Sequence, residues 1–159
     1  MRLWHYKLIP FLPNSQLIAQ WRELNSIFKK QDKHILINYV YEYPKEELYW
    51  YSRLVINELS NCGINIKKTA NFYEYFKDLD CNNYYKDSDL FKKHHTMRYL
   101  WQCFANLQEK YDRGQKDFSD ELYEKLEMFV QEEGIVARYK VGKEFKLWNT
   151  LEQKMVFTN

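Results

Sequence analysis

A carboxylate flanked by cations marks a predicted helix over residues 15–30. Projected at about 100° per residue, Arg22 and Glu23 lie opposite the apolar stripe of that helix. The same face carries Ser26, Lys29 and Lys30. A carboxylate can move a proton or stabilise a developing positive charge, whereas cations can hold phosphates. The segment therefore combines groups for acid–base chemistry with groups that bind a polyanion. The alternative is a surface carboxylate that pairs with Lys29 or Lys30.

Metal, nucleotide and hydrolase motifs are absent from the sequence. His94 and His95 are adjacent, so on a helix they would point about 100° apart and share one metal poorly. A solvated polar turn is the favoured interpretation of this pair. No glycine-rich phosphate loop, GxSxG, HExxH or CxxC occurs. The cysteines are odd in number and lack paired spacing, which predicts reduced thiols in a cytoplasmic protein and no metal: Cys62, Cys81 and Cys103.

Composition predicts one folded domain. The chain has 159 residues, of which 45% are hydrophobic and only 4 are Gly and 3 Pro, so disordered and collagen-like classes are excluded. Aromatic residues make up 18%, which suits a domain whose rings both fill a core and stack on a ligand. No apolar run could span a bilayer and the first residues do not form a signal peptide. We expect no membrane partner and a monomer.

Positive charge gathers in three segments although the net charge is only +2. Residues 1–30 carry five Lys or Arg against one acid, residues 91–113 five against two, and residues 135–159 five against two. If the fold brings these segments to one face, they would form a footprint for a polyanion. The alternative is that solvated helix faces happen to sort in this way.

The elements that would position these residues are mainly helical. Apolar periodicity predicts helices over residues 15–30, 44–62, 89–113 and 119–133, with a short one at 70–78. The β-branched and aromatic segments 34–43 and 136–141 are predicted as strands. We therefore expect a mainly α fold, a single compact domain over residues 1–159 with about four main helices and, at most, a minor short hairpin.

Three motifs, in order along residues 1–113, resemble one family. Residues 17–28 match a helix of the form LxAxYREL..xF through Leu17, Ala19, Arg22, Glu23, Leu24 and Phe28, with Trp21 in place of its Tyr. Residues 63–66 (GINI) are similar to a GFNI that closes a second helix, which His34 precedes, and residues 105–110 (ANLQEK) are similar to ARLDEK. Together they resemble the pyrimidine-dimer DNA glycosylases of the phage endonuclease V type.

The resemblance implies an all-α enzyme whose nucleophile is its own N-terminal α-amine. Met1 would supply that amine and Glu23 the carboxylate that stabilises the sugar cation and removes the C2′ proton. An α-amine has a pKa near 7.7–8.0 against about 10.4 for Lys, so more of it is neutral at pH 7. Damaged double-stranded DNA would be the partner and no cofactor is required. The phosphate contacts would be Arg2, Arg22, Lys29, Lys30 and Lys110.

The sequence departs from the family at several of these positions. Arg2 is large where the family exposes a small residue after removal of Met. Ser26 and Asn106 stand in place of Arg, and Gln16 in place of His. We expect Gln16, Ser26 and His34 to lie near the site, with His5 and His34 acting as structural hydrogen-bonding groups. Fewer phosphate contacts predict weaker DNA affinity or a different lesion. A non-catalytic nucleic-acid-binding member of the fold and a helical protein–protein adaptor remain alternatives.

Overall fold

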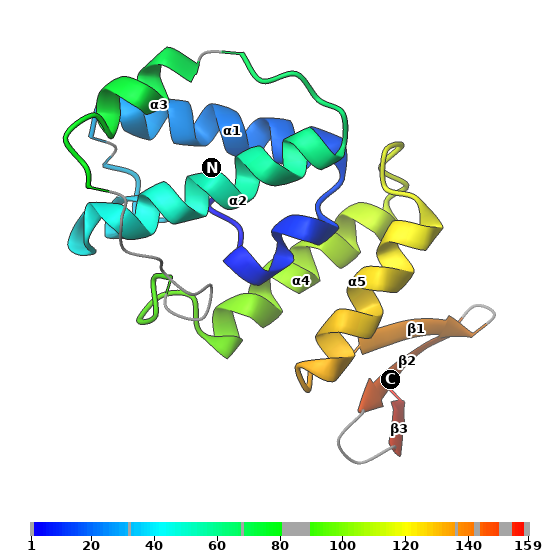
Figure 1. Cartoon of the computed structure of the whole chain (residues 1–159). Coiled ribbons are helices and arrows are strands. Elements are labelled where there is room, and N and C mark those ends of the chain that lie inside the picture. Colours follow the sequence, from blue (N-terminus) through cyan, green and yellow to red (C-terminus); the bar gives the residue numbers. More distant parts are fainter. Residues whose placement is uncertain are drawn as a thin grey trace. The chain divides into compact units, whose positions relative to one another are not determined.

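The computed structural model describes residues 2–31, 33–67, 69–80, 90–135, 137–141, 144–149 and 154–157. It is mainly helical, as the periodicity predicted, and forms two compact units, Met1–Cys103 and Phe104–Asn159. Each unit is described by itself (Figure 1). Whether residues 1–159 fold as a single domain stays a prediction.

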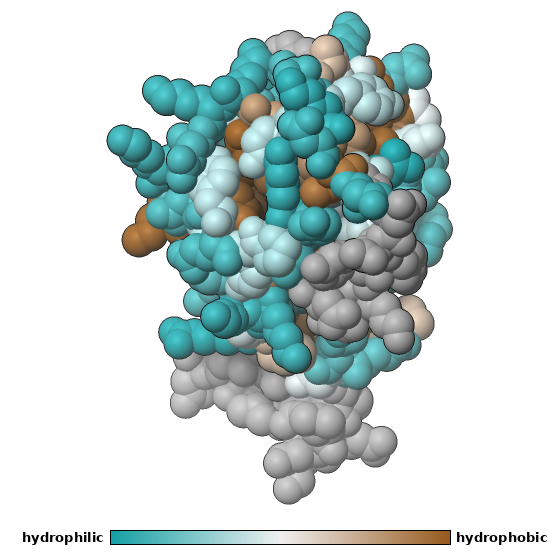
Figure 2. All heavy atoms as spheres, turned by 60° about the vertical axis from the view of Figure 1, so that its left-hand side comes forward, coloured by the Kyte–Doolittle hydropathy of each residue, from teal (hydrophilic) through white to brown (hydrophobic). Residues whose placement is uncertain are grey.

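The first unit is built on two helices that pack against each other, α1 (Asn14–Lys29) and α2 (Lys45–Asn61). The short 3-10 helix η1 (Tyr6–Phe11) contacts α2, and α3 (Thr69–Tyr75) contacts α1. The unit also holds η2 (Asn38–Glu42) and the start of α4 (Met97–Asp112). In Figure 2 hydrophilic side chains cover most of the coloured surface, with hydrophobic residues visible between them and one hydrophobic side chain projecting outward.

Aromatic side chains fill the space between α1, α2 and α3. The Phe28 ring lies 5.8 Å from Phe72 and 5.4 Å from Phe76, edge to face in both cases. Tyr49 of α2 stacks on Phe72 at 5.6 Å. Such pairs contribute roughly 0.5–1.5 kcal/mol each beyond the area that they bury. These contacts fix α1, which carries the Arg22–Glu23 pair, against the rest of the unit.

The second unit contains the rest of α4, helix α5 (Asp120–Glu132) and a three-stranded antiparallel sheet. Ser119 caps α5 by accepting from the Leu122 N–H at 3.2 Å. The rings of Tyr111 and Tyr123 stack in parallel at 3.8 Å. The strands are β1 (Ala137–Val141), β2 (Glu144–Asn149) and β3 (Lys154–Phe157), in the order β1-β2-β3. The predicted strand at 136–141 is confirmed over Ala137–Val141, and the sheet exceeds the expected hairpin by one strand.

The predicted strand over residues 34–43 is wrong. The His34 carbonyl accepts from the N–H groups of Ile37 and Asn38, both at 2.9 Å, and this turn leads into η2. Within the described part of the first unit there is no strand to pair with this segment. Tyr39 and Val40 are instead buried from a 3-10 turn, because β propensity measures how well a side chain suits a half-buried surface and not a backbone preference.

The helix predicted over 89–113 begins only at Met97. Phe91 has a φ of 51°, in the left-handed region that interrupts a right-handed helix. Its N–H donates to the Glu47 Oε2 at 2.5 Å, and its carbonyl accepts from the His95 N–H at 2.7 Å. Residue 89 lies outside the described residues. Met97, the first residue of α4, and Cys62, which follows the last residue of α2, are exposed although the apolar spacing of each predicted helix includes them.

Candidate functional site

The first site feature is a buried clamp on the backbone of Trp4. The Trp4 N–H donates to Gln20 Oε1 at 2.9 Å, and the Trp4 carbonyl accepts from the Tyr51 hydroxyl at 2.8 Å. The same hydroxyl lies 3.0 Å from Gln20 Oε1, so it shares one proton between two acceptors. Gln20 and Tyr51 are buried, and an unpaired backbone group there would be costly. The chain is therefore fixed three residues after its first residue.

The residues on either side of Trp4 are held in the same way. The Tyr99 hydroxyl donates to the Leu3 carbonyl. The Tyr6 N–H donates to His95 Nδ1 at 3.2 Å, and His5 Nε2 lies 3.0 Å from the His95 carbonyl. Backbone groups of Leu3, Trp4 and Tyr6 are thus bonded to side chains from α1, α2, α4 and the turn before α4. We call Leu3–Tyr6 the anchored segment.

Tyrosine and histidine side chains around the anchored segment are electrically neutral. Burial raises the pKa of the Tyr39 and Tyr99 hydroxyls far above the usual value for tyrosine. Burial, with the charges of His5 and His94, lowers the pKa of His95 well below 6.5. Tyr39 is the partner of His95, with its hydroxyl 2.8 Å from Nε2. Tyr39, Tyr99 and His95 therefore act on the anchored segment as neutral dipoles, and the Arg2 guanidinium beside Tyr99 is the charged group next to them.

Glu23 lies one helical turn beyond Gln20, on the side of α1 that faces the anchored segment through Gln20. Its side chain is half-buried, and its Oε2 atom is buried. Met1, the other predicted catalytic residue, lies outside the described residues. It directly precedes Arg2 and the anchored segment.

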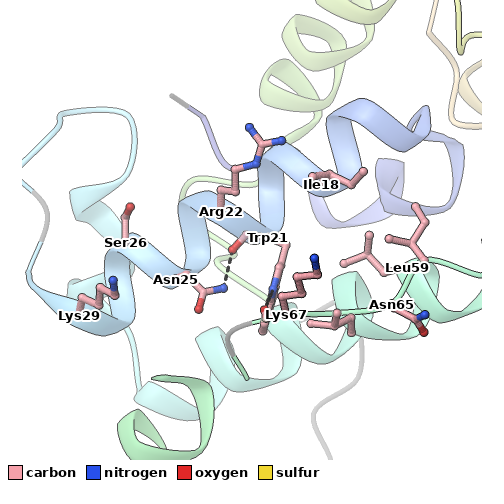
Figure 3. A pocket seen from close by; sticks show the side chains of 11 residues that line it. Ile18, Trp21, Arg22, Asn25, Ser26, Lys29, Leu59, Asn65 and Lys67 are labelled. Carbon is pink, nitrogen blue, oxygen red and sulfur yellow. Dashed lines mark hydrogen bonds between the residues drawn. The ribbon is translucent and has the colours of Figure 1, made fainter. Parts of the chain in front are cut away.

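A pocket of about 440 Å³ lies on the neighbouring face of α1 (Figure 3). Arg22, Ser26 and Lys29 line it at i, i+4 and i+7, so they share one stripe of the helix. The opposite wall is the segment Ile64–Lys67 that follows α2. Cations from both walls reach the pocket, and in Figure 3 the Trp21 ring points from α1 toward Lys67.

The opposite wall of the pocket is set by the end of α2. Gly63 has a φ of 69°, and the Ile64 N–H donates back to the Leu59 carbonyl at 2.9 Å, which ends the helix and turns the chain. The Trp21 Nε1–H then donates to the Lys67 carbonyl at 2.8 Å. Asn25 is buried and donates from Nδ2 to the Trp21 carbonyl at 2.8 Å. These bonds fix the Trp21 ring as a rigid wall of the pocket.

The remaining predicted site residues are dispersed. Lys30 is exposed at the end of α1, and Gln16 is half-buried near its start. His34 is exposed, and its Nδ1 accepts from the Leu36 N–H at 3.3 Å. Arg2 is half-buried, with Nη1 buried and its guanidinium beside Cys103 and Tyr99, so it differs from the exposed cations. Lys110 lies on α4 in the second unit.

The sequence analysis missed the groups that hold the anchored segment. The expected solvated turn at His94–His95 is wrong for His95, which is buried at 6% exposure. Its contacts join residues 56 and 89 positions apart along the chain. Periodicity within a helix cannot reveal such contacts. The available signal was the polar residues Gln20 and Tyr51 on otherwise apolar helix faces.

The family comparison covers the anchored segment, all of α1, all of α2 and the pocket walls. Residues 1–72 match the family model of the pyrimidine dimer DNA glycosylases. The suspected resemblance to this glycosylase family is therefore confirmed over those residues. The similarity of residues 105–110 to an ARLDEK motif falls outside the glycosylase match and stays a prediction. Comparison with curated proteins gave no match, and comparison with solved structures gave none either.

The described part of the chain shows neither a metal-binding cluster nor a membrane-spanning helix. No group of three His, Cys, Asp or Glu side chains in it could hold a metal ion. None of its helices has the length and apolarity that crossing a membrane requires.

Proposed function

We propose that this protein is a DNA N-glycosylase with abasic-site lyase activity, acting on pyrimidine dimers or related damaged bases. The α-amine of Met1 is the nucleophile and Glu23 its carboxylate partner. The observation that carries the proposal is the glycosylase match over residues 1–72, which includes both residues. The anchored segment supports it, because a nucleophile at the end of a chain needs the residues that follow it to be fixed.

The chemistry requires one amine and one carboxylate. The neutral amine attacks C1′ of the damaged nucleotide, the C1′–N bond to the base breaks, and the base leaves with the bonding electrons and a proton. Opening of the sugar ring gives a protonated Schiff base between the amine and C1′. Glu23 stabilises the positive charge that develops and then takes the C2′ proton. Loss of that proton expels the 3′ phosphate and cleaves the strand. No cofactor is needed.

We assign the pocket beside Trp21 to a nucleotide held outside the duplex. Its volume of about 440 Å³ falls within the usual range for small-molecule sites, and Trp21 offers an aromatic wall for stacking. Arg22, Lys29 and Lys67 would hold the phosphates around that nucleotide. Arg22 and Glu23 are consecutive on α1, so binding and chemistry would lie on adjacent faces of one helix.

The other partner assignments remain proposals of the same kind. Arg2, Lys30 and Lys110 would contact the DNA backbone elsewhere. Ser26 lines the pocket where the family has Arg, so we expect weaker phosphate binding at that position. We expect a monomer that acts in the cytoplasm on double-stranded DNA.

Borohydride trapping on an abasic-site duplex tests the proposed function. Borohydride reduces a Schiff base to a stable amine, so a covalent protein–DNA adduct should form with the native N-terminus. The adduct should disappear when extra residues precede Met1. An equally strong adduct with the extended protein would contradict the proposal.

The same samples separate the two alternatives. A non-catalytic nucleic-acid-binding protein would give no adduct but would bind the duplex, with affinity that falls steeply as salt rises. A protein–protein adaptor would give no adduct and no salt-dependent binding of DNA.

A further inference from the structure

We propose that His95 is a positioning residue for the start of the chain: as a neutral imidazole that accepts the Tyr6 N–H and is braced by Tyr39, it fixes the anchored segment and thereby aims the N-terminal amine. This inference deepens the proposed function and rests on it for the identity of the nucleophile. The geometry on which it depends concerns the folded protein alone.

Backbone donors determine the tautomer of His95. A backbone N–H can only donate, so the 3.2 Å contact from the Tyr6 N makes His95 Nδ1 an acceptor. The ring proton of neutral His95 is then on Nε2, where it faces the Tyr39 hydroxyl at 2.8 Å. Protonation of Nδ1 would place one N–H against another and break the bond to Tyr6.

His5 obeys the same rule within the anchored segment. Its Nδ1 accepts from the Lys7 N–H at 3.2 Å, so its proton is on Nε2 and donates to the His95 carbonyl at 3.0 Å. The two imidazole rings stack at 5.0 Å. The His5 side chain thus bonds to the backbone of His95, and the His95 side chain bonds to the backbone of Tyr6, the residue after His5.

The surroundings of His95 disfavour a charge on its ring. Desolvation is the largest effect, followed by the charges of His5 and His94. The turn that carries His95 is itself fixed by the Glu47 carboxylate, which accepts from the Phe91 N–H. The titratable side chains whose rings pack against it come from η1, η2, α2 and α4: Tyr6, Tyr39, Tyr51 and Tyr99. Arg2 and Cys103 lie beside Tyr99.

His94 provides a matched control, since it neighbours His95 but holds nothing in the anchored segment. Its ring is half-buried, and its Nδ1 lies 2.7 Å from the Tyr43 hydroxyl. That hydroxyl accepts from the Lys93 N–H at 3.0 Å, so it donates to His94. The same substitution at positions 94 and 95 therefore separates contact with Tyr6 from the general cost of losing an imidazole.

The experiment compares His95→Phe, His95→Asn and His94→Asn in the full chain with its native N-terminus. Amide hydrogen exchange of the N-terminal peptide reports on the anchored segment without DNA. Borohydride trapping on an abasic duplex, at several DNA concentrations, reports on the amine. In His95→Phe we expect exchange at Tyr6 to rise about tenfold. The maximal trapping rate should fall about 100-fold, with half-saturating DNA unchanged.

Rescue distinguishes positioning from a merely structural role. The Asn amide oxygen lies near the place of Nδ1 and cannot be protonated, so His95→Asn should restore both readouts. The ratio of the wild-type trapping rate to that of His95→Asn cancels the titration of the amine itself. This ratio should fall only as the pH approaches the folded-state pKa of His95, which lies well below 6.5. His94→Asn should match wild type in both readouts.

Failure of this inference is distinguishable from failure of the proposed function. If wild type forms no adduct but His95→Phe still loosens Tyr6, the function is wrong and the anchoring stands. If the exchange rate at Tyr6 and the trapping rate of His95→Phe both equal those of the wild type, the inference is overturned. If His95→Phe does not fold, His95→Gln replaces it. Gln puts its amide near the place of Nε2 and not of Nδ1, so it should not restore the bond from the Tyr6 N–H. Equal behaviour of His95→Gln and His95→Asn would then overturn the inference.

Discussion

The anchored segment and the pocket lie on adjacent sides of α1 and are built in opposite ways. The anchored segment is fixed by buried, neutral side chains such as Gln20, Tyr51 and His95, each bonded to the backbone. The pocket carries three cations, Arg22, Lys29 and Lys67, beside an otherwise apolar and neutral lining, and Arg22 and Lys29 are exposed. The anchored segment and the pocket lining fall within the glycosylase match over residues 1–72, whereas His95 lies outside it.

This difference separates the residues that position the start of the chain from the residues that would bind DNA. A buried dipole network loses stability when one partner is removed, because the other is left unpaired without water. An exposed cation loses only a screened interaction when it is removed, and the loss depends on salt. Changes near the anchored segment should therefore alter rate and stability, whereas changes in the pocket should alter binding.

Glu23→Gln should have the largest effect on the reaction. The amide keeps the shape of the side chain but cannot take a proton, so we expect the strand-cleavage rate to fall about 1,000-fold. DNA affinity should stay within about twofold of wild type, because no cation of the pocket is lost. Single-turnover cleavage of an abasic duplex measures the rate and filter binding the affinity. Glu42→Gln, an exposed carboxylate on η2, is the control. Equal rates for both variants would contradict the assignment of Glu23.

Gln20→Ala should have the largest effect on folding. It leaves the Trp4 N–H without its acceptor and opens a buried gap, so the free energy of unfolding should fall by about 3 kcal/mol. Urea unfolding followed by circular dichroism measures this loss. The exposed Asn57 on α2 gives the control Asn57→Ala, which should stay within about 0.5 kcal/mol of wild type. A loss for Gln20→Ala below that of the control would mean that the clamp contributes nothing.

The double variant Arg22→Ala/Lys29→Ala should change binding and leave folding intact. Loss of two phosphate contacts should reduce the slope of log affinity against log salt by about two. Fluorescence anisotropy on a labelled duplex, measured over a salt series, gives this slope. Lys125→Ala is the control, because Lys125 already pairs with Glu121 at 2.7 Å on α5. An unchanged slope in the double variant would exclude the pocket rim from the DNA interface.

Acid should destabilise the protein through His95. The pKa of this residue is lowered on folding, so the unfolded chain binds the proton more readily than the native one. Its contribution is therefore fully present above pH 6.5 and is lost as the pH falls toward the folded-state pKa. The loss should be about 1.4 kcal/mol for each pH unit in that window. Urea unfolding of wild type and His95→Asn between pH 5 and 7.5 isolates it. If the free energy of unfolding depends on pH in the same way in both proteins, His95 is not the source of the acid destabilisation.

Trp21→Phe should have the smallest effect. The substitution keeps an aromatic ring in the pocket wall but removes the hydrogen bond from Nε1 to the Lys67 carbonyl. The free energy of unfolding should therefore fall by about 1 kcal/mol. Stacking on a nucleotide should survive, whereas Trp21→Ala should weaken DNA binding further, by about 1–3 kcal/mol. Thermal unfolding and duplex binding measure the two effects. Equal binding by Trp21→Phe and Trp21→Ala would remove the nucleotide from the proposed pocket.

Local patterns were enough to predict most of the helices. Apolar spacing located α1 and α2 to within about two residues at each end, because their stripes are long and regular. It failed before Met97, where a positive φ at Phe91 depends on a hydrogen bond to Glu47, 44 positions away. It also failed over residues 34–43, where burial and not strand pairing selects the β-branched and aromatic side chains.

The candidate site was predictable only where it lies on one helix. The register of α1 predicted that Arg22, Ser26 and Lys29 share a face, and the structure confirms it. The same register puts Glu23 opposite the apolar stripe, where its side chain is half-buried and its Oε2 atom is buried. The contacts of His95 with the anchored segment join distant parts of the chain, so no local spacing could have revealed them.

Mapping the reduced adduct tests the central claim most directly. After borohydride trapping on an abasic duplex, protease digestion and mass spectrometry identify the nitrogen that carries the sugar remnant. We predict that the remnant is on the α-amine of Met1, in a peptide that contains the anchored segment. A remnant on a lysine side chain, such as Lys29 or Lys67 at the pocket, would contradict the account, because the nucleophile would then lie with the cations and not at the start of the chain.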